Sequence, residues 1–257
     1  MFRHGLIARP KNQYATLAAF SDEGNHALVN GLTRTGATLL STLGKSVNQK
    51  LDYTAGNAAL MPLTLAPAID VTVAMMAFDA ACTAAGLELL DQPDLPLPAS
   101  STDRTFACKF TVELGHLKKR IDITNVPDRA FSILLPDHSR TNYFLERDRG
   151  TMVIGTKRTR LIGKSSFRKK QIGYFHFWRQ GLHTERFAMT RFRVLTIAPS
   201  ESRINSMLDA QQDVTANTAS GLFLYSTPQR ITKYGALGSA WISTQRNDIS
   251  LLEGRAK

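Results

Sequence analysis

The sequence contains only two cysteines, Cys82 and Cys108, among 257 residues. Two cysteines cannot build the disulfide framework of a small secreted domain, and they are too few for a cysteine-rich zinc site. Long apolar runs are also missing, because prolines, Asp70 and Asp79 interrupt the most apolar stretch, 60–90. The first residues lack the apolar segment of a signal peptide. We therefore expect a soluble, cytoplasmic protein with no membrane partner.

Acidic residues are nearly absent from one segment, 149–193, where Glu185 is the only one. The same segment holds twelve basic residues, and the rest of the chain has twenty basic and twenty acidic residues. The whole net charge of +11 therefore lies in 45 residues, and seven aromatic residues are interleaved with it. This clustering favours a nucleic-acid partner, because lysines and arginines that meet phosphates release counterions. The alternatives are an ordinary basic surface and an anionic lipid surface.

The composition, with 43 % hydrophobic and 21 % charged residues, is that of a globular protein. Residues 31–64 show little pattern and predict irregular structure, preceded by a short helix that Ser21 caps. Hydrophobic periodicity then predicts helices and strands in alternation. The predicted helices are 67–86, 166–181 and 199–212, and the predicted strands are 106–114, 120–124, 128–135, 142–148, 191–198 and 221–225. This order predicts an α/β fold, a mixed central sheet flanked by helices.

Three carboxylates fall together in this scheme. Asp128 follows Pro127 at the start of one predicted strand, and Glu146 and Asp148 lie two apart on the next, so they share a face. A turn centred at residue 138 or 139 would place Asp128 opposite about residue 149. Clustered carboxylates repel one another unless a cation relieves them, and oxygen ligands suit Mg²⁺ or Mn²⁺. The basic helix that follows would supply Lys169 or Lys170 to the same place.

Each of these residues also has a structural explanation. Asp128 could only cap a turn after Pro127, and Asp148 could pair with Arg147, Arg149 or another arginine. Lys170 could contact a phosphate without a catalytic role, and Tyr174 could pack against the sheet. The aromatic residues Phe175 and Trp178 are expected in the core, and His138, His176 and His183, which lack metal-ligand spacing, are expected at the surface or in turns.

The pattern Pro127-Asp128, 17 residues, then Glu146-Arg147-Asp148 resembles the PD-(D/E)xK nuclease superfamily, whose core is restriction-endonuclease-like. The segments 126–131, 143–152, 167–174 and 192–203 resemble, more closely, the plasmid replication-relaxation family. The resemblance extends over about residues 120–212. It implies DNA binding in the replication or mobilisation of plasmids or mobile elements, together with other proteins of those processes.

Carried over residue by residue, the resemblance gives Asp128, Glu146 and Lys170 as catalytic residues, and Asp128, Glu146 and Asp148 as ligands of Mg²⁺ or Mn²⁺. Asp148 stands where the superfamily has lysine, and Lys170-x-x-x-Tyr174 resembles a lysine that has migrated to the next helix, where residues four apart share a face. The predicted DNA-binding residues are Lys157, Arg158, Arg160, Lys164, Arg168 and Lys169.

Members of this family tend to begin with a winged-helix domain, and residues 9–17 resemble its last wing alone. We therefore expect a partial winged-helix remnant and linker in 1–64, the nuclease-like core in 65–227 and a tail in 228–257. Three functions stay open at this point: a metal-dependent DNA endonuclease, a non-catalytic DNA-binding module on the same fold, and an RNA-binding or structural protein.

Overall fold

The computed structural model describes residues 4–9, 30–44, 62–99, 105–114, 119–155, 165–215 and 221–252. They belong to two compact units, Met1–Val73 and Ala74–Lys257. In the first unit, β1 (Ile7–Ala8) pairs antiparallel with β2 (Gly31–Leu32), and α2 (Arg34–Thr42) follows. Thr33 caps this helix by accepting a hydrogen bond from the Gly36 amide. The expectation of irregular structure from residue 31 was therefore wrong for α2.

The predicted helix at 67–86 is confirmed as α4 (Pro62–Ala84), which continues from the first unit into the second. In the second unit its buried residues Ala74, Phe78 and Cys82 are four apart and form one stripe, whereas Met76 is exposed. Among the described helices, the Ala66–Ala84 part of α4 alone is long and apolar enough to cross a membrane. This finding rests on length and composition only, and 17 % of the helix window is buried inside the structure.

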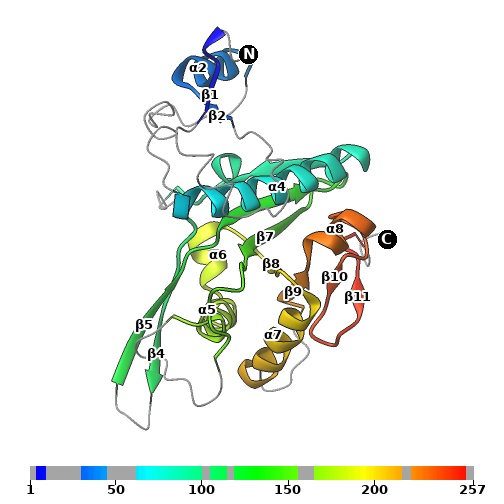
Figure 1. The fold of residues 1–257 in the computed structure, drawn as a ribbon. Helices are drawn as coiled ribbons and strands as arrows, with labels where there is room; N and C mark the ends of the chain where they lie inside the picture. Colours follow the sequence, from blue (N-terminus) through cyan, green and yellow to red (C-terminus); the bar gives the residue numbers. More distant parts are fainter. Residues whose placement is uncertain are drawn as a thin grey trace. The chain divides into compact units, whose positions relative to one another are not determined.

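The second unit is built on a mixed seven-stranded sheet (Figure 1), with strand order β11-β10-β9-β8-β7-β6-β3. The strands β7, β8 and β9 run parallel, and the other neighbours in the sheet run antiparallel. The strand bounds are β3 Glu88–Asp91, β6 Arg129–Leu134, β7 Arg140–Arg147, β8 Phe192–Ile197, β9 Phe223–Ser226, β10 Trp241–Ile242 and β11 Asp248–Ile249. The predicted mixed α/β sheet flanked by helices is thus confirmed.

Helices connect the parallel strands and cover the sheet. After the short 3-10 helix η2 (Gln92–Asp94), the helix bounds are α5 Phe167–Arg179, α6 Leu182–Phe187, α7 Glu201–Val214 and α8 Pro228–Tyr234. One face of the sheet packs on α4, where the Phe78 ring lies 4.7 Å from Phe131 and 6.0 Å from Trp241. The opposite face packs on α5, α6 and α7 through the largest hydrophobic cluster, in which Phe144 contacts Phe187 and Phe192. The site described below lies on this second face.

A separate two-stranded ribbon lies between β3 and β6 in the chain. It consists of β4 (Cys108–Leu114) and β5 (Lys119–Asn125), and it forms a sheet of its own (Figure 1). Its residues Phe110 and Ile123 pack on Ile172 of α5, and Phe110 stacks on His176 at 5.8 Å. The ribbon is thereby attached to the helix that carries the candidate lysine.

Two features of the sheet differ from the sequence predictions. The chain after residue 227, expected as a tail, contributes α8, β10 and β11, and the last two strands complete one edge of the sheet. The hairpin of β6 and β7 closes between Leu134 and Arg140, earlier than predicted, and Arg129 pairs with Leu145. Asp128, which directly precedes β6, therefore lies beside the end of β7, where its amide donates to the Leu145 carbonyl, and not opposite residue 149.

Candidate functional site

Glu146 is a buried carboxylate near the carboxyl end of β7, with 3 % of its surface exposed. Its neighbours Phe144 and Leu145 are fully buried, and alternation along the strand directs Glu146 to the same face as Phe144, under α5. A carboxylate is rarely buried unless charged or hydrogen-bonding partners satisfy it. The surrounding groups therefore decide what this residue can do.

Both oxygens of Glu146 have partners on α5. The Lys170 ammonium donates to Oε2 at 2.5 Å, and the Tyr174 hydroxyl donates to Oε1 at 2.5 Å. The two donors are four residues apart on one helix face, as the spacing Lys170-x-x-x-Tyr174 predicted. The Lys170 side chain remains 28 % exposed, so the pair lies where the buried core meets solvent.

Local contacts hold the helical turn that presents Lys170. Ser166 caps α5 by accepting a hydrogen bond from the Lys169 amide, and the Asn125 side-chain amide of the ribbon donates to the Lys170 carbonyl at 2.7 Å. The close approach of Asn125 requires glycine at position 173, because a Cβ atom there would overlap the Asn125 amide. Lys170 is thus placed by its own helix and by the ribbon together.

Asp128 lies at the start of β6, beside the end of β7, and its side chain is exposed. Its amide donates to the Leu145 carbonyl at 3.0 Å, and its Oδ2 accepts from the Arg147 amide at 2.7 Å. The Asp128 carboxylate therefore has a structural partner, but this partner is the backbone at the end of β7 and not the turn after Pro127 that its structural explanation invoked. The same hydrogen bonds bring its charge close enough to influence both Glu146 and Lys170.

The cluster contains two carboxyl groups, of Asp128 and Glu146, and one ammonium, of Lys170, and these groups shift one another's pKa values. Burial raises the pKa of the Glu146 carboxyl; the Lys170 ammonium opposes this rise, and the Asp128 charge adds to it. Burial alone would lower the pKa of Lys170, but the charges of Glu146, Asp128 and Asp148 raise it overall, so the ammonium is retained. Burial and the Glu146 charge raise the pKa of Tyr174 well above its usual range, which keeps its hydroxyl a donor.

Asp148 faces a different partner. It is 8 % exposed, and its two oxygens accept from Arg203 of α7, from Nε at 2.9 Å and from Nη2 at 3.1 Å. The Gly150 amide donates to the same carboxylate at 3.2 Å. Asp148 therefore forms a bidentate ion pair, as its structural explanation required, and its partner is Arg203 and not Arg147 or Arg149. We therefore leave Asp148 out of the metal site proposed below.

The predicted DNA-binding residues fall into two groups. Arg168 and Lys169 lie half-buried on the first turn of α5, next to Lys170, and the Arg168 Nε atom is buried without a hydrogen-bond partner within the described ranges. The remaining four, Lys157, Arg158, Arg160 and Lys164, lie outside the residues that the structure describes.

A buried polar row continues from Glu146 across the sheet, and the sequence analysis missed it. Thr196 of β8 is paired in register with Glu146, and Tyr225 of β9 with Thr196. The Tyr225 hydroxyl accepts from Gln171 of α5 at 2.9 Å and donates to Gln211 of α7 at 2.8 Å. The available signal was a polar residue inside an apolar strand, as Thr196 is in Val194–Ile197.

Other residues also differ from expectation. Trp178, expected in the core, is 40 % exposed, whereas His183, expected at the surface or in a turn, is 5 % exposed. His138 lies in the turn between β6 and β7 with φ 62°, as expected. Cys108 and Cys82 are free and buried, and burial, followed by the Glu146 charge, raises the pKa of the Cys108 thiol well above its usual range.

The carboxylates of Asp128 and Glu146 offer oxygen ligands of the kind that Mg²⁺ and Mn²⁺ prefer. Within the described parts of the chain, no group of three or more histidine, cysteine, aspartate and glutamate side chains is placed to hold a metal. Mg²⁺, however, is commonly bound by one or two carboxylates together with waters and substrate phosphates. Asp128 and Glu146 are the two carboxylates at this place, and each of their oxygens has two lone pairs, of which the contacts described here use at most one.

Comparisons of the chain with protein-family models, with curated proteins and with solved structures found no match.

Proposed function

We propose that this protein binds DNA and cleaves it with the help of a divalent metal ion, using a core of the PD-(D/E)xK type, in the replication or mobilisation of plasmids or mobile elements. The observation that carries the proposal is the contact of Lys170 with Glu146, with the Asp128 carboxylate on the neighbouring Arg147 amide. Two carboxylates and one ammonium, which influence one another electrostatically, support a site at the end of β7.

The order of elements supports the nuclease-like core. Helix α4, strands β3, β6 and β7, helix α5 and strand β8 follow one another around the site, and the β4–β5 ribbon is an insertion between β3 and β6. This helix–three strands–helix–strand order is the one that the superfamily resemblance implies. In this proposal the winged-helix part expected in residues 1–64 includes the β1–β2 pair and α2, while residues 10–17 of the expected wing lie outside the part of the chain that the structure describes.

Each residue has a defined task in this function. Asp128 and Glu146 would hold Mg²⁺ or Mn²⁺, which supplies Lewis acidity to a bound phosphate and lowers the pKa of its water. Lys170 provides a fixed positive charge beside the point where negative charge grows on the phosphate during displacement. Tyr174 donates to Glu146 and fixes the orientation of its carboxylate.

The basic segment supplies the affinity for DNA. Arg168 and Lys169 adjoin Lys170 on α5, and in the sequence the four basic residues from Lys157 to Lys164 lead directly into this helix. Phosphate contacts by such residues give binding that weakens steeply with salt. In this proposal the basic segment binds the duplex so that a phosphate of the DNA backbone lies near Glu146.

Nicking of a supercoiled plasmid by the purified full chain tests the proposal, in Mg²⁺ or Mn²⁺ and in EDTA. We expect metal-dependent nicking, which Glu146→Gln and Asp128→Asn abolish while gel-shift binding is retained. Asp128→Asn is the sharper variant, because its side chain is exposed and its replacement leaves the core intact. Asp209→Asn makes the same charge change on an exposed side chain that pairs with Arg246, outside the site, and it should nick like the wild type. Nicking that survives in both acidic variants would refute the metal site.

A second function, a non-catalytic DNA-binding module that recruits replication proteins, is favoured by one observation. Both oxygens of Glu146 are occupied by Lys170 and Tyr174, and Asp148 is held by Arg203, so the cluster is also satisfied as a structural one. The same assay separates the two functions. Salt-sensitive DNA binding without nicking in either metal would select the binding module.

A further inference from the structure

A groove of about 430 Å³ lies at the carboxyl ends of β8 and β9, apart from the Glu146 site. One wall is the segment that leads into α7, with Ser200 and Glu201, and the other is α8, with Gln229, Arg230, Lys233 and Tyr234. A hollow outside the carboxyl ends of parallel strands is the common position of ligand sites in α/β sheets.

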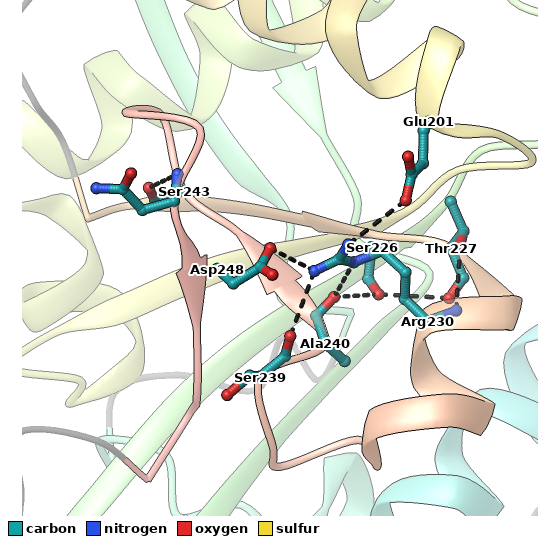
Figure 2. Close-up of polar contacts among 9 residues, drawn as sticks. Glu201, Ser226, Thr227, Arg230, Ser239, Ala240, Ser243 and Asp248 are labelled. Carbon is teal, nitrogen blue, oxygen red and sulfur yellow. Dashed lines mark hydrogen bonds and ion pairs between the residues drawn. The ribbon is translucent and has the colours of Figure 1, made fainter.

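Arg230 makes the groove a fixed structure (Figure 2). Its guanidinium donates to the Ala240 carbonyl at 3.0 Å and to the Ser239 carbonyl at 3.3 Å, and it pairs with Asp248 of β11. With its side chain 13 % exposed, Arg230 ties α8 to the chain around β10 and β11. Its contact with Glu201 is longer, at 3.4 Å, and the Glu201 side chain is 65 % exposed.

The accessible chemistry of the groove is cationic and aromatic. Lys233 is exposed, and its ammonium lies 4.8 Å from the centre of the Tyr234 ring, which is itself 42 % exposed. A lysine beside an exposed aromatic ring offers a nucleic-acid strand a phosphate contact and a surface for a sugar or base. Gln229 adds an amide in the same wall.

The groove lies in line with the Glu146 site along one edge of the sheet. Arg147, Ile197 and Ser226, at the ends of β7, β8 and β9, are in register. The Asp148 amide donates to the Ile197 carbonyl, and the Ala198 amide to the Ser226 carbonyl. Two strand spacings of roughly 4.8 Å separate β7 from β9.

We infer that this groove is a second DNA-binding subsite, in which Lys233 contacts a backbone phosphate of the duplex that is bound near Glu146, and Tyr234 contacts the adjoining sugar or base. This inference rests on the proposed function. Glu201 opposes the phosphate by its charge, and its exposure lets it turn to solvent when the strand is bound.

The test measures binding of a fluorescein-labelled duplex to the full chain by anisotropy, in a series of NaCl concentrations. We expect Lys233→Gln to weaken binding about three- to tenfold and to reduce the slope of log K against log salt by about 0.9, the value for one phosphate contact. Tyr234→Ala should weaken binding with little change in the slope, and Glu201→Gln should strengthen it. All three side chains are exposed, so unchanged melting curves are expected.

Arg246→Gln is the matched control, because it removes one positive charge at the β10–β11 turn, where Arg246 pairs with Asp209 and does not line the groove. If Lys233→Gln and Arg246→Gln change the affinity and slope equally while the wild type binds DNA, the groove is not a subsite and the proposed function stands. If the wild type shows no salt-dependent binding to the duplex, the proposed function and the subsite both fail.

Discussion

Replacing Lys170 with methionine should destabilise the second unit at neutral pH, because it leaves the Glu146 carboxylate buried without its cation. Removing one partner of a buried ion pair costs roughly 3–5 kcal/mol. The Lys170 side chain is 28 % exposed and Glu146 is 4 % exposed, so water replaces part of the lost interaction at the lysine end. We therefore expect a loss of about 2–3 kcal/mol in the free energy of unfolding, with Tyr174 still donating to Glu146.

Intrinsic tryptophan fluorescence is the suitable assay, because both tryptophans, Trp178 and Trp241, lie in the unit that contains the site. A loss of this size lowers the melting temperature of a domain of this length by roughly 5–10 °C. Glu146→Gln combined with Lys170→Met should recover most of the stability, because the neutral amide needs no counter-charge. Additive losses in the double variant would refute the reasoning.

The pH dependence supplies a second check on the same variant. Since burial raises the pKa of Glu146, the folded state takes up a proton at a higher pH than the unfolded chain does. The defect of Lys170→Met should therefore be largest at neutral pH and diminish as the pH falls through the folded-state pKa. A defect that grows on acidification would mean that the lost interaction was not with a buried carboxylate.

Three further outcomes follow from the structure. Gly173→Ala should cost about 1–3 kcal/mol by overpacking against Asn125, measured by urea unfolding, and a neutral result would contradict the close approach. Arg203→Leu should cost roughly 3–5 kcal/mol by leaving Asp148 buried and unpaired, with most of the loss recovered by adding Asp148→Asn in the same melt. Burial lowers the pKa of His183, so this residue should reduce stability as the pH falls below about 6.5; His183→Gln should show a flatter profile between pH 7 and 5, and an identical profile would exclude this source.

The sequence predicts the candidate site better than its surroundings, because the site depends on short-range spacing. Lys170 and Tyr174 are four residues apart on a helix whose amphipathic pattern is clear, and Glu146 follows a run of buried residues in a strand. These local patterns are sufficient to put the three side chains on facing surfaces. Local patterns do not predict which residue of β7 lies beside Asp128. That position depends on which residues close the β6–β7 turn, which contains His138 with its positive φ.

Long-range pairing explains most of what the sequence could not predict. Arg203 contacts Asp148 because α7 packs beside the end of β7, and no sequence spacing predicts this pair. The strands β10 and β11 have two residues each, which is too short for any periodicity, so the end of the sheet resembled a tail. His183 is buried among aromatic rings, including Phe192 at 5.2 Å, although its residue type is common at surfaces.

The β4–β5 ribbon is not part of the seven-stranded sheet, and its largest contact with the rest of the unit is with α5. The Asn125 amide donates to the carbonyl of Lys170, and Ile172 and His176 pack on the ribbon from the same helix. The ribbon therefore contacts the turn of helix that faces Glu146. If a ligand of the ribbon displaces this turn and so changes the affinity of Glu146 for a proton or a cation, occupation of Glu146 must change the affinity of the ribbon for that ligand by the same factor.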